Sequence, residues 1–150
     1  MRRPILILAL CLMVCATASA ATGKVIKVLP QFLDLKGRAA LSPSLYDRDA
    51  YQAYLRVHTT NISSMRFVVQ WKAHGASNLK LRVEVRGVTQ SGLPPNLVLE
   101  QPVKTGILFN RWTYLPVSVE DYKRIGEVTA WRATLWDGDT MIGEQASFLW

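Results

Sequence analysis

Residues 79–87 read LKLRVEVRG, and every second side chain in this stretch is apolar. In an extended chain Leu79, Leu81, Val83 and Val85 share one face, while lysine, arginine and glutamate occupy the other. Such a strand buries one face in a core and exposes the other to water, which is typical of antiparallel sheets. Residues 65–73 (MRFVVQWKA) follow a similar alternation, and HGASN at 74–78 has the composition of a loop.

Further short strands are expected on both sides of this pair. They lie at residues 24–35, 97–100, 112–119, 128–136 and 140–150. Pro30 places the first of them at a sheet edge or a bend, because proline has no N–H to donate to a ladder. Asp137-Gly138-Asp139 suits a tight hairpin turn. About seven strands with turns at this spacing predict an all-β, antiparallel sandwich of the immunoglobulin or fibronectin type III kind.

Aromatic side chains on the apolar faces of these strands are expected to fill the space between the sheets. They are Phe67, Trp71, Trp131 and Phe148. A short helical turn is expected ahead of the strand that holds Trp131. Ser118 and Asp121 have the spacing of a capping box at its start, and Gly126 can end it. This turn, which holds Tyr122, loosely resembles the corner before the penultimate strand of immunoglobulin-like domains.

One stretch breaks the β pattern, because residues 44–56 (SLYDRDAYQAYLR) carry apolar side chains at helical spacing. One short helix is expected near residues 45–57, with Ser44 as its N-cap and Asp47 completing a capping box. The apolar stripe of this helix consists of Tyr46, Ala50, Ala53, Tyr54 and Val57, and Tyr51 and Leu55 extend it. The opposite face consists of Arg48, Asp49, Gln52 and Arg56. A helix of this length is marginal alone, so we expect the stripe to pack across an edge or open end of the sandwich.

The tyrosines of this helix offer an alternative. Tyr46, Tyr51 and Tyr54 have the composition of an aromatic platform for a sugar or a peptide. A platform needs rings that face outward, whereas these rings lie on the stripe that the helix is expected to bury. Tyr51 lies at the edge of the stripe and is expected to reach solvent most easily.

The first twenty residues have the form of a secretory signal peptide. Arg2 and Arg3 precede an apolar run, and Ala18-Ser19-Ala20 is a cleavage-site pattern, so we expect cleavage after Ala20 and one sandwich domain over residues 21–150. Both cysteines lie inside the signal, which leaves no disulfide in the exported chain and favours a bacterial periplasm or exterior. Lipoprotein processing at Cys15 is a weaker alternative. Removal of the two arginines lowers the formal net charge from +7 to +5.

Patterns typical of catalysis are not found in the sequence. It contains no Gly-x-Ser-x-Gly elbow, and no cysteine nucleophile follows the signal peptide. His58 and His74 stand beside turn-like segments at a spacing unlike that of zinc ligands. Glu120 and Asp121 are adjacent on a helical turn and point apart, unlike a glycosidase pair. We therefore expect a non-enzymatic protein with no catalytic residues, no cofactor and no metal.

A basic strand face is the candidate ligand-binding site. Its members all alternate with apolar positions, and they are Arg66, Lys72, Lys80, Arg82 and Arg86. If the two strands form a hairpin, like charges oppose one another, which would favour an anionic ligand. If consecutive strands enter opposite sheets, the cluster is divided between two faces.

The expected function is an interaction or accessory module of the cell envelope, whose partner is an unidentified protein or an anionic envelope component. Binding of an envelope polysaccharide or of lipid headgroups through the basic face is the alternative. A small outer-membrane β-barrel is a second alternative, because the aromatic end of the sequence at Trp150 resembles a barrel assembly signal. Nucleic acid is not an expected partner, and no transmembrane helix is expected after removal of the signal peptide.

Overall fold

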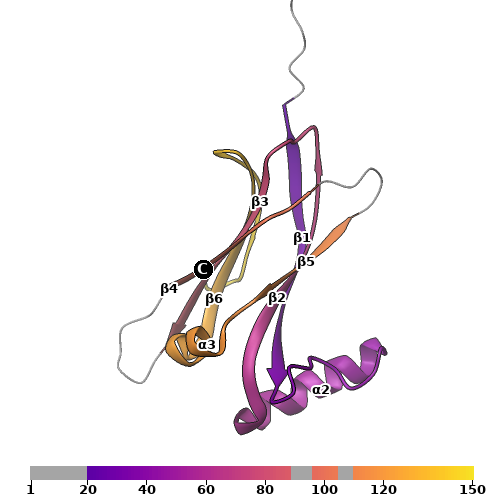
Figure 1. Ribbon diagram of the computed structural model, residues 1–150, viewed down its shortest axis with the longest axis vertical. Coiled ribbons are helices and arrows are strands. Elements are labelled where there is room, and N and C mark those ends of the chain that lie inside the picture. Colours follow the sequence, from indigo (N-terminus) through magenta and orange to yellow (C-terminus); the bar gives the residue numbers. More distant parts are fainter. Residues whose placement is uncertain (1–19, 89–95, 105–109) are drawn as a thin grey trace, which may run out of the picture.

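A computed structural model describes residues 20–88, 96–104 and 110–150. Almost all of the expected signal peptide lies outside these residues. The described chain forms a β-sandwich of two antiparallel sheets (Figure 1). The three-stranded sheet has the order β1 (Thr22–Asp34), β2 (Ile62–His74) and β5 (Arg111–Pro116). The four-stranded sheet has the order β4 (Asn96–Pro102), β3 (Leu79–Val88), β6 (Glu127–Asp137) and β7 (Thr140–Ala146).

The strand order confirms the predicted fold class. Strands β1, β2 and β5 lie opposite β3, β6 and β7, as in immunoglobulin-like sandwiches, and β4 pairs with β3. The consecutive strands β2 and β3 lie in different sheets. They therefore do not form the simple hairpin in which Lys72 opposes Lys80 and Arg66 opposes Arg86. The predicted basic face is divided between the two sheets.

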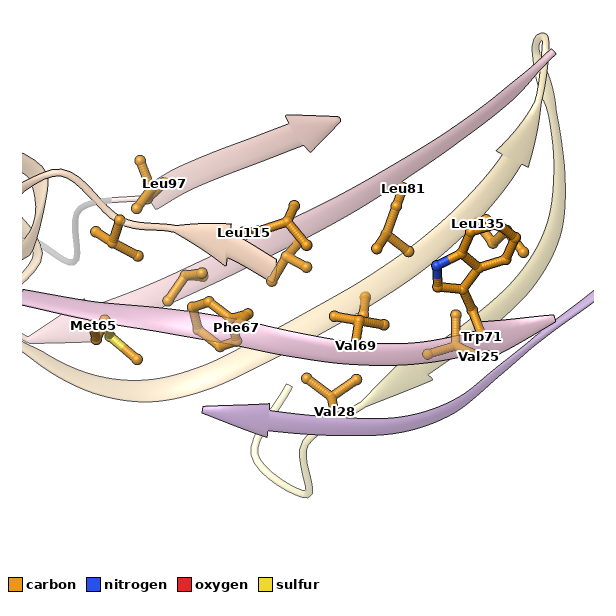
Figure 2. Packing of buried hydrophobic residues seen from close by; sticks show 14 of the residues in the cluster. Val25, Val28, Met65, Phe67, Val69, Trp71, Leu81, Leu97, Leu115 and Leu135 are labelled. Carbon is orange, nitrogen blue, oxygen red and sulfur yellow. The ribbon is translucent and has the colours of Figure 1, made fainter. Parts of the chain in front are cut away.

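The alternation of residues 79–87 builds one wall of the core. Leu81 and Val83 on β3 are fully buried, and β2 supplies Phe67, Val69 and Trp71 from the facing sheet (Figure 2). Burial of such side chains stabilises the fold by about 1.5–3 kcal/mol each. The indole N–H of Trp71 donates to the hydroxyl of Thr113 on β5 at 2.8 Å, so this buried ring leaves no polar atom unpaired.

The other two aromatic predictions had mixed outcomes. Trp131 is partly buried and packs against the core. Phe148 is fully exposed, so its predicted core position is wrong. The reason is that β7 ends at Ala146, and the Ser147 N–H then donates to the Trp131 carbonyl at 2.8 Å while the chain turns away. Phe148 therefore does not continue the alternation of β7.

Helix α3 (Val119–Ile125) covers one end of the sandwich (Figure 1). Ser118 caps it as predicted, because its hydroxyl accepts a hydrogen bond from the Asp121 N–H at 3.0 Å, and Gly126 follows it at a φ of 68°. Ile125 is buried against β3 at Gly87, where a Cβ would lie 2.1 Å from the Ile125 carbonyl oxygen. Only glycine allows this approach of helix and strand.

Helix α2 (Leu45–Val57) has the predicted bounds and cap, but most of the predicted apolar stripe does not pack. Its buried residues are Leu55, from the extension of the stripe, and Gln52, from the face expected to meet solvent. The five central residues of the stripe are exposed, with Tyr46 at 82% and Val57 at 78%, so the prediction that they are buried was wrong. Hydrogen bonds, rather than apolar burial, hold much of this contact with β1.

The side chain of Gln52 bonds the edge of β1 in the way a neighbouring strand would. Its Oε1 accepts from the Phe32 N–H at 2.8 Å, and its Nε2 donates to the Phe32 carbonyl at 2.9 Å and to the Ala39 carbonyl at 2.8 Å. These bonds satisfy every polar atom of the buried amide except one lone pair. They explain why a glutamine is buried where the sequence suggested a solvent-facing residue.

Tyr51 is also placed differently from the prediction. It is partly buried, and its hydroxyl donates to Asp34 Oδ2 at 2.8 Å, so it is not the most exposed tyrosine of the helix. Its ring stacks on Tyr54 at a centroid distance of 6.0 Å, and Tyr54 stacks on His58 at 4.1 Å. Tyr51 and Tyr54 therefore stack on each other, and the hydroxyl of Tyr51 is used within the fold.

The two sheets approach closely at one end and separate at the other. Near the start of β1, a Cβ on Gly143 of β7 would lie 3.0 Å from the carbonyl oxygen of Gly23, so the strands are in direct backbone contact. Towards the end of β1, a cleft opens between β1 and β2 on one side and α3 and β6 on the other. This open end is the hollowed part of the sandwich.

Candidate ligand-binding cleft and the outer faces of the two sheets

The cleft at the open end has a volume of about 700 Å³. Clefts of roughly 300–1,000 Å³ with mainly apolar walls are typical of small-molecule sites. Apolar and aromatic side chains from both sheets and from α3 line it, namely Pro30, Phe32, Ile62, Met65, Tyr122, Val128 and Trp131. Met65 is 1% exposed and forms part of the floor.

The local sequence explains why these side chains meet. Phe32 and Met65 are register partners on β1 and β2, so both project to the inner face of the three-stranded sheet. Trp131 pairs with Val85 and projects to the inner face of the four-stranded sheet. Since β7 pairs with β6 only from Arg132 onward, the first residues of β6 stand at the margin of the cleft.

The charged groups of the cleft are mostly cationic, and Thr59 and Thr129 add uncharged polar groups to its lining. Arg56 at the end of α2 and Lys123 on α3 are exposed at its margin, and Glu127 is the carboxylate that lines it. Neither cation forms an ion pair within residues 20–88, 96–104 and 110–150. Burial raises the pKa of Tyr122, so its phenol stays neutral at physiological pH. The cleft therefore carries a net positive charge beside an apolar interior.

Three of the five predicted basic residues lie on the outer face of the four-stranded sheet, and each has a partner there. Glu100 on β4 forms ion pairs with both Lys80 and Arg82. The side-chain hydrogen bond from Arg82 lowers the pKa of Glu100. Arg86 lies over the ring of Trp150, with its guanidinium carbon 4.0 Å from the ring centroid.

A third ion pair adds to the charge balance of this face. Arg132 on β6 donates to Glu84 on β3 at 2.6 and 2.8 Å, and its guanidinium also lies 5.1 Å from the Trp150 ring centroid. Cations and carboxylates therefore alternate across the outer face of the four-stranded sheet. This arrangement does not favour a polyanion there.

The other two predicted basic residues lie on the outer face of the three-stranded sheet. Arg66 donates to Gln31 Oε1 at 3.0 Å and lies over the Tyr114 ring at 4.9 Å, whereas Lys72 is exposed. Lys24 on β1 is the register partner of Lys72, and sequence analysis did not include it in the basic face. The placement of Lys24 opposite Lys72 on this face, and of Arg56 and Lys123 together at the cleft, is visible in the structure and not in the sequence.

Asp34, at the end of β1, is a buried carboxylate with a structural role. Burial acts to raise its pKa, but hydrogen bonds from the backbone N–H groups of Arg38 and Lys36, the Tyr51 hydroxyl and the Arg38 guanidinium hold the pKa well below its usual range. These donors join the loop after β1 and helix α2 to the strand. The Asp34 carboxylate therefore stabilises the fold.

The two histidines do not share a site. His58 follows α2, and His74 ends β2, so the whole of that strand separates them. At about 3.3 Å per residue the separation is on the order of 40 Å. Among the described residues there is no group of three or more histidine, cysteine, aspartate or glutamate side chains placed to hold a metal ion. None of the helices in the described ranges is long and apolar enough to cross a membrane.

Comparison of the chain with protein-family models, with curated proteins and with solved structures finds no match.

Proposed function

We infer that this chain is an exported, non-enzymatic binding module that holds an amphiphile with one anionic group in the cleft between its two sheets. The observation that carries this proposal is the combination of an apolar cleft of about 700 Å³ with Arg56 and Lys123 at its margin. An alkyl or aromatic body fits the walls formed by Phe32, Met65 and Trp131. The anionic group would lie near the two cations, where exposure of both side chains keeps it in contact with water.

Charge complementarity selects this ligand class. Arg56 and Lys123 outnumber Glu127, so a cationic head would meet net repulsion and an uncharged head would gain no attraction from the two cations. The export proposal rests on the form of residues 1–20. The non-enzymatic proposal is supported by the separation of His58 from His74.

Calorimetric titration with three ligands that share one tail tests the proposal. Dodecanoate, dodecanol and dodecyltrimethylammonium differ only in the charge and size of the head, so we expect their affinities to fall in that order. Replacing Val128 by Trp should narrow the cleft and weaken binding of all three ligands. Equal affinity for the three, or affinities unchanged by V128W in a folded protein, would overturn the proposal.

The cations at the margin have a separate test. R56Q/K123Q should weaken dodecanoate binding by about tenfold and leave dodecanol unchanged, because only the charged head interacts with them. The matched control is K80Q/K104Q, which removes the same charge elsewhere, from exposed or half-exposed lysines that do not line the cleft. A similar loss in the control would show that net charge alone governs binding.

A further inference from the structure

The outer face of the three-stranded sheet brings four cations and two aromatic rings together. We name it the basic-aromatic face, and it consists of Lys24, Lys27, Arg66, Lys72, Trp112 and Tyr114. Register fixes their positions, because Lys24 pairs with Lys72, and Lys27, Gln70 and Trp112 form one row across β1, β2 and β5. Tyr114 lies in the next row opposite Val68.

A bulge in β1 is what gathers the lysines. Lys24 and Lys27 are three residues apart, which would place them on opposite faces of a regular strand. The register of β1 against β2 shifts between Val25 and Lys27, so one extra residue is accommodated there. As a result Val25 and Val28 both face the core, and both lysines face outward.

Among the described residues, no carboxylate forms an ion pair with a cation of this face. No acidic residue occupies an outward position of β1, β2 or β5 in the described part of the chain. Asp49 of α2, beside the far end of β1, is already paired with Arg48 at 2.9 Å. Lys24 directly opposite Lys72 is an unfavourable arrangement for the isolated sheet. An anionic ligand would relieve this repulsion.

The aromatic rings add a second kind of contact. Trp112 is 45% exposed and Tyr114 is 53% exposed, so each side chain is half covered by the protein and half open to solvent. They stand two residues apart on β5, about 7 Å along the strand, on the same side of the sheet. Half-covered rings on a flat sheet can stack against sugar rings, whereas insertion into a membrane requires side chains that protrude. The amide of Gln70 lies between them and Lys27 and can bond hydroxyl groups.

We propose that the basic-aromatic face binds a linear acidic polysaccharide, whose carboxylate or sulfate groups pair with the lysines while its sugar rings stack on Trp112 and Tyr114. The ligand lies along the outer face of the sheet and is separate from the cleft, which opens on the inner side. This second site does not depend on the amphiphile proposed above.

Retention on immobilised polygalacturonate, with neutral dextran as the reference matrix, tests the proposal. The wild type should bind the acidic chain and not dextran, and its affinity should fall steeply as salt rises. K24Q/K72Q should weaken binding by at least about tenfold, whereas the equally charged K80Q/K104Q should bind like the wild type. V128W, which narrows the cleft, should leave retention unchanged.

A second variant separates recognition of sugar rings from simple ion exchange. W112A removes a half-exposed ring and no charge, and it should weaken binding by about fivefold or more with its salt dependence unchanged. Its thermal unfolding temperature shows whether the fold is retained, and Y114A provides a second aromatic variant. Full binding by both folded aromatic variants would overturn the proposal.

Two other ligand classes are included as direct competitors. Vesicles of phosphatidylglycerol and single-stranded poly(dT) are offered to the wild type in the same buffer as polygalacturonate. The expected result is weaker binding to both than to the polysaccharide. Tighter binding to either of them, or loss of binding in K80Q/K104Q equal to that in K24Q/K72Q, would overturn the assignment.

Discussion

The two outer faces of the sandwich differ in whether their charged side chains are paired. On the four-stranded sheet, Glu84 and Glu100 neutralise neighbouring cations, and Trp150 covers two guanidinium groups. On the three-stranded sheet, lysines oppose one another, and the carboxylate of Asp34 is used at the end of β1 to fix a loop and a helix. Charges that pair with one another on a sheet face stabilise the fold. Cations that have no carboxylate partner on their face remain able to bind an anionic ligand.

The largest expected effect comes from removing the buried carboxylate. D34A should lower the free energy of unfolding by about 3 kcal/mol, because it leaves the Arg38 guanidinium, the Tyr51 hydroxyl and two N–H groups without their acceptor. E100A, which removes a half-exposed carboxylate from the other sheet, should cost less than about 1 kcal/mol. Urea unfolding of the two variants measures both values, and similar losses would contradict the distinction between internal and surface acids.

The unfolding free energy should depend on pH through the same carboxylate, Asp34. The pKa of Asp34 is depressed in the folded state, so its stabilising contribution is complete above about pH 5 and is lost as the pH falls through about 4 toward the folded-state pKa. The wild type should therefore lose unfolding free energy more steeply on acidification than D34N does. Urea titrations at a series of pH values test this, and parallel curves for the two proteins would contradict it.

The charge balance of the four-stranded sheet can be broken deliberately. E84Q/E100Q removes the carboxylate partners of Lys80, Arg82 and Arg132 on that face. The expected cost in stability is about 1 kcal/mol, because these ion pairs are partly exposed. Retention on polygalacturonate should rise above that of the wild type. Unchanged retention would show that paired carboxylates are not what keeps this face from binding.

The smallest expected effect has the opposite sign for fold and binding. K24Q removes one of two opposed lysines, so it should raise the free energy of unfolding by a few tenths of a kcal/mol, roughly the cost of like charges directly opposite. The same substitution should weaken polysaccharide binding. Thermal unfolding and retention measured on one protein preparation test both parts. K72Q repeats the test from β2, and a loss of stability in both variants would contradict the register argument.

The architecture could be predicted from sequence because its signals are local. The alternation in β3, the hairpin at Gly138 and the caps at Ser44 and Ser118 depend on residues close together in the chain. These signals gave the sandwich, the helix bounds and both N-caps correctly.

The candidate sites depend on pairings that local patterns do not contain. Burial of Gln52 requires the backbone of Phe32, twenty residues earlier, so the helical wheel selected the wrong face of α2. Lys24 and Lys27 join one face only because of a bulge, and the three-residue spacing concealed this. The cleft likewise results from the divergence of two sheets, which hydropathy does not record. The sequence therefore indicated which residue types were present, but not which of them would be neighbours in space.

The amide of Gln52 has a consequence for contacts between molecules. Strand β1 is an edge of its sheet, and unpaired backbone groups at an edge invite addition of a strand from another chain. At Phe32 the outward donor and acceptor are already occupied by one side chain, so an incoming strand would have to displace α2 before it could pair there. A single glutamine thus occupies the backbone groups that an added strand would need at Phe32.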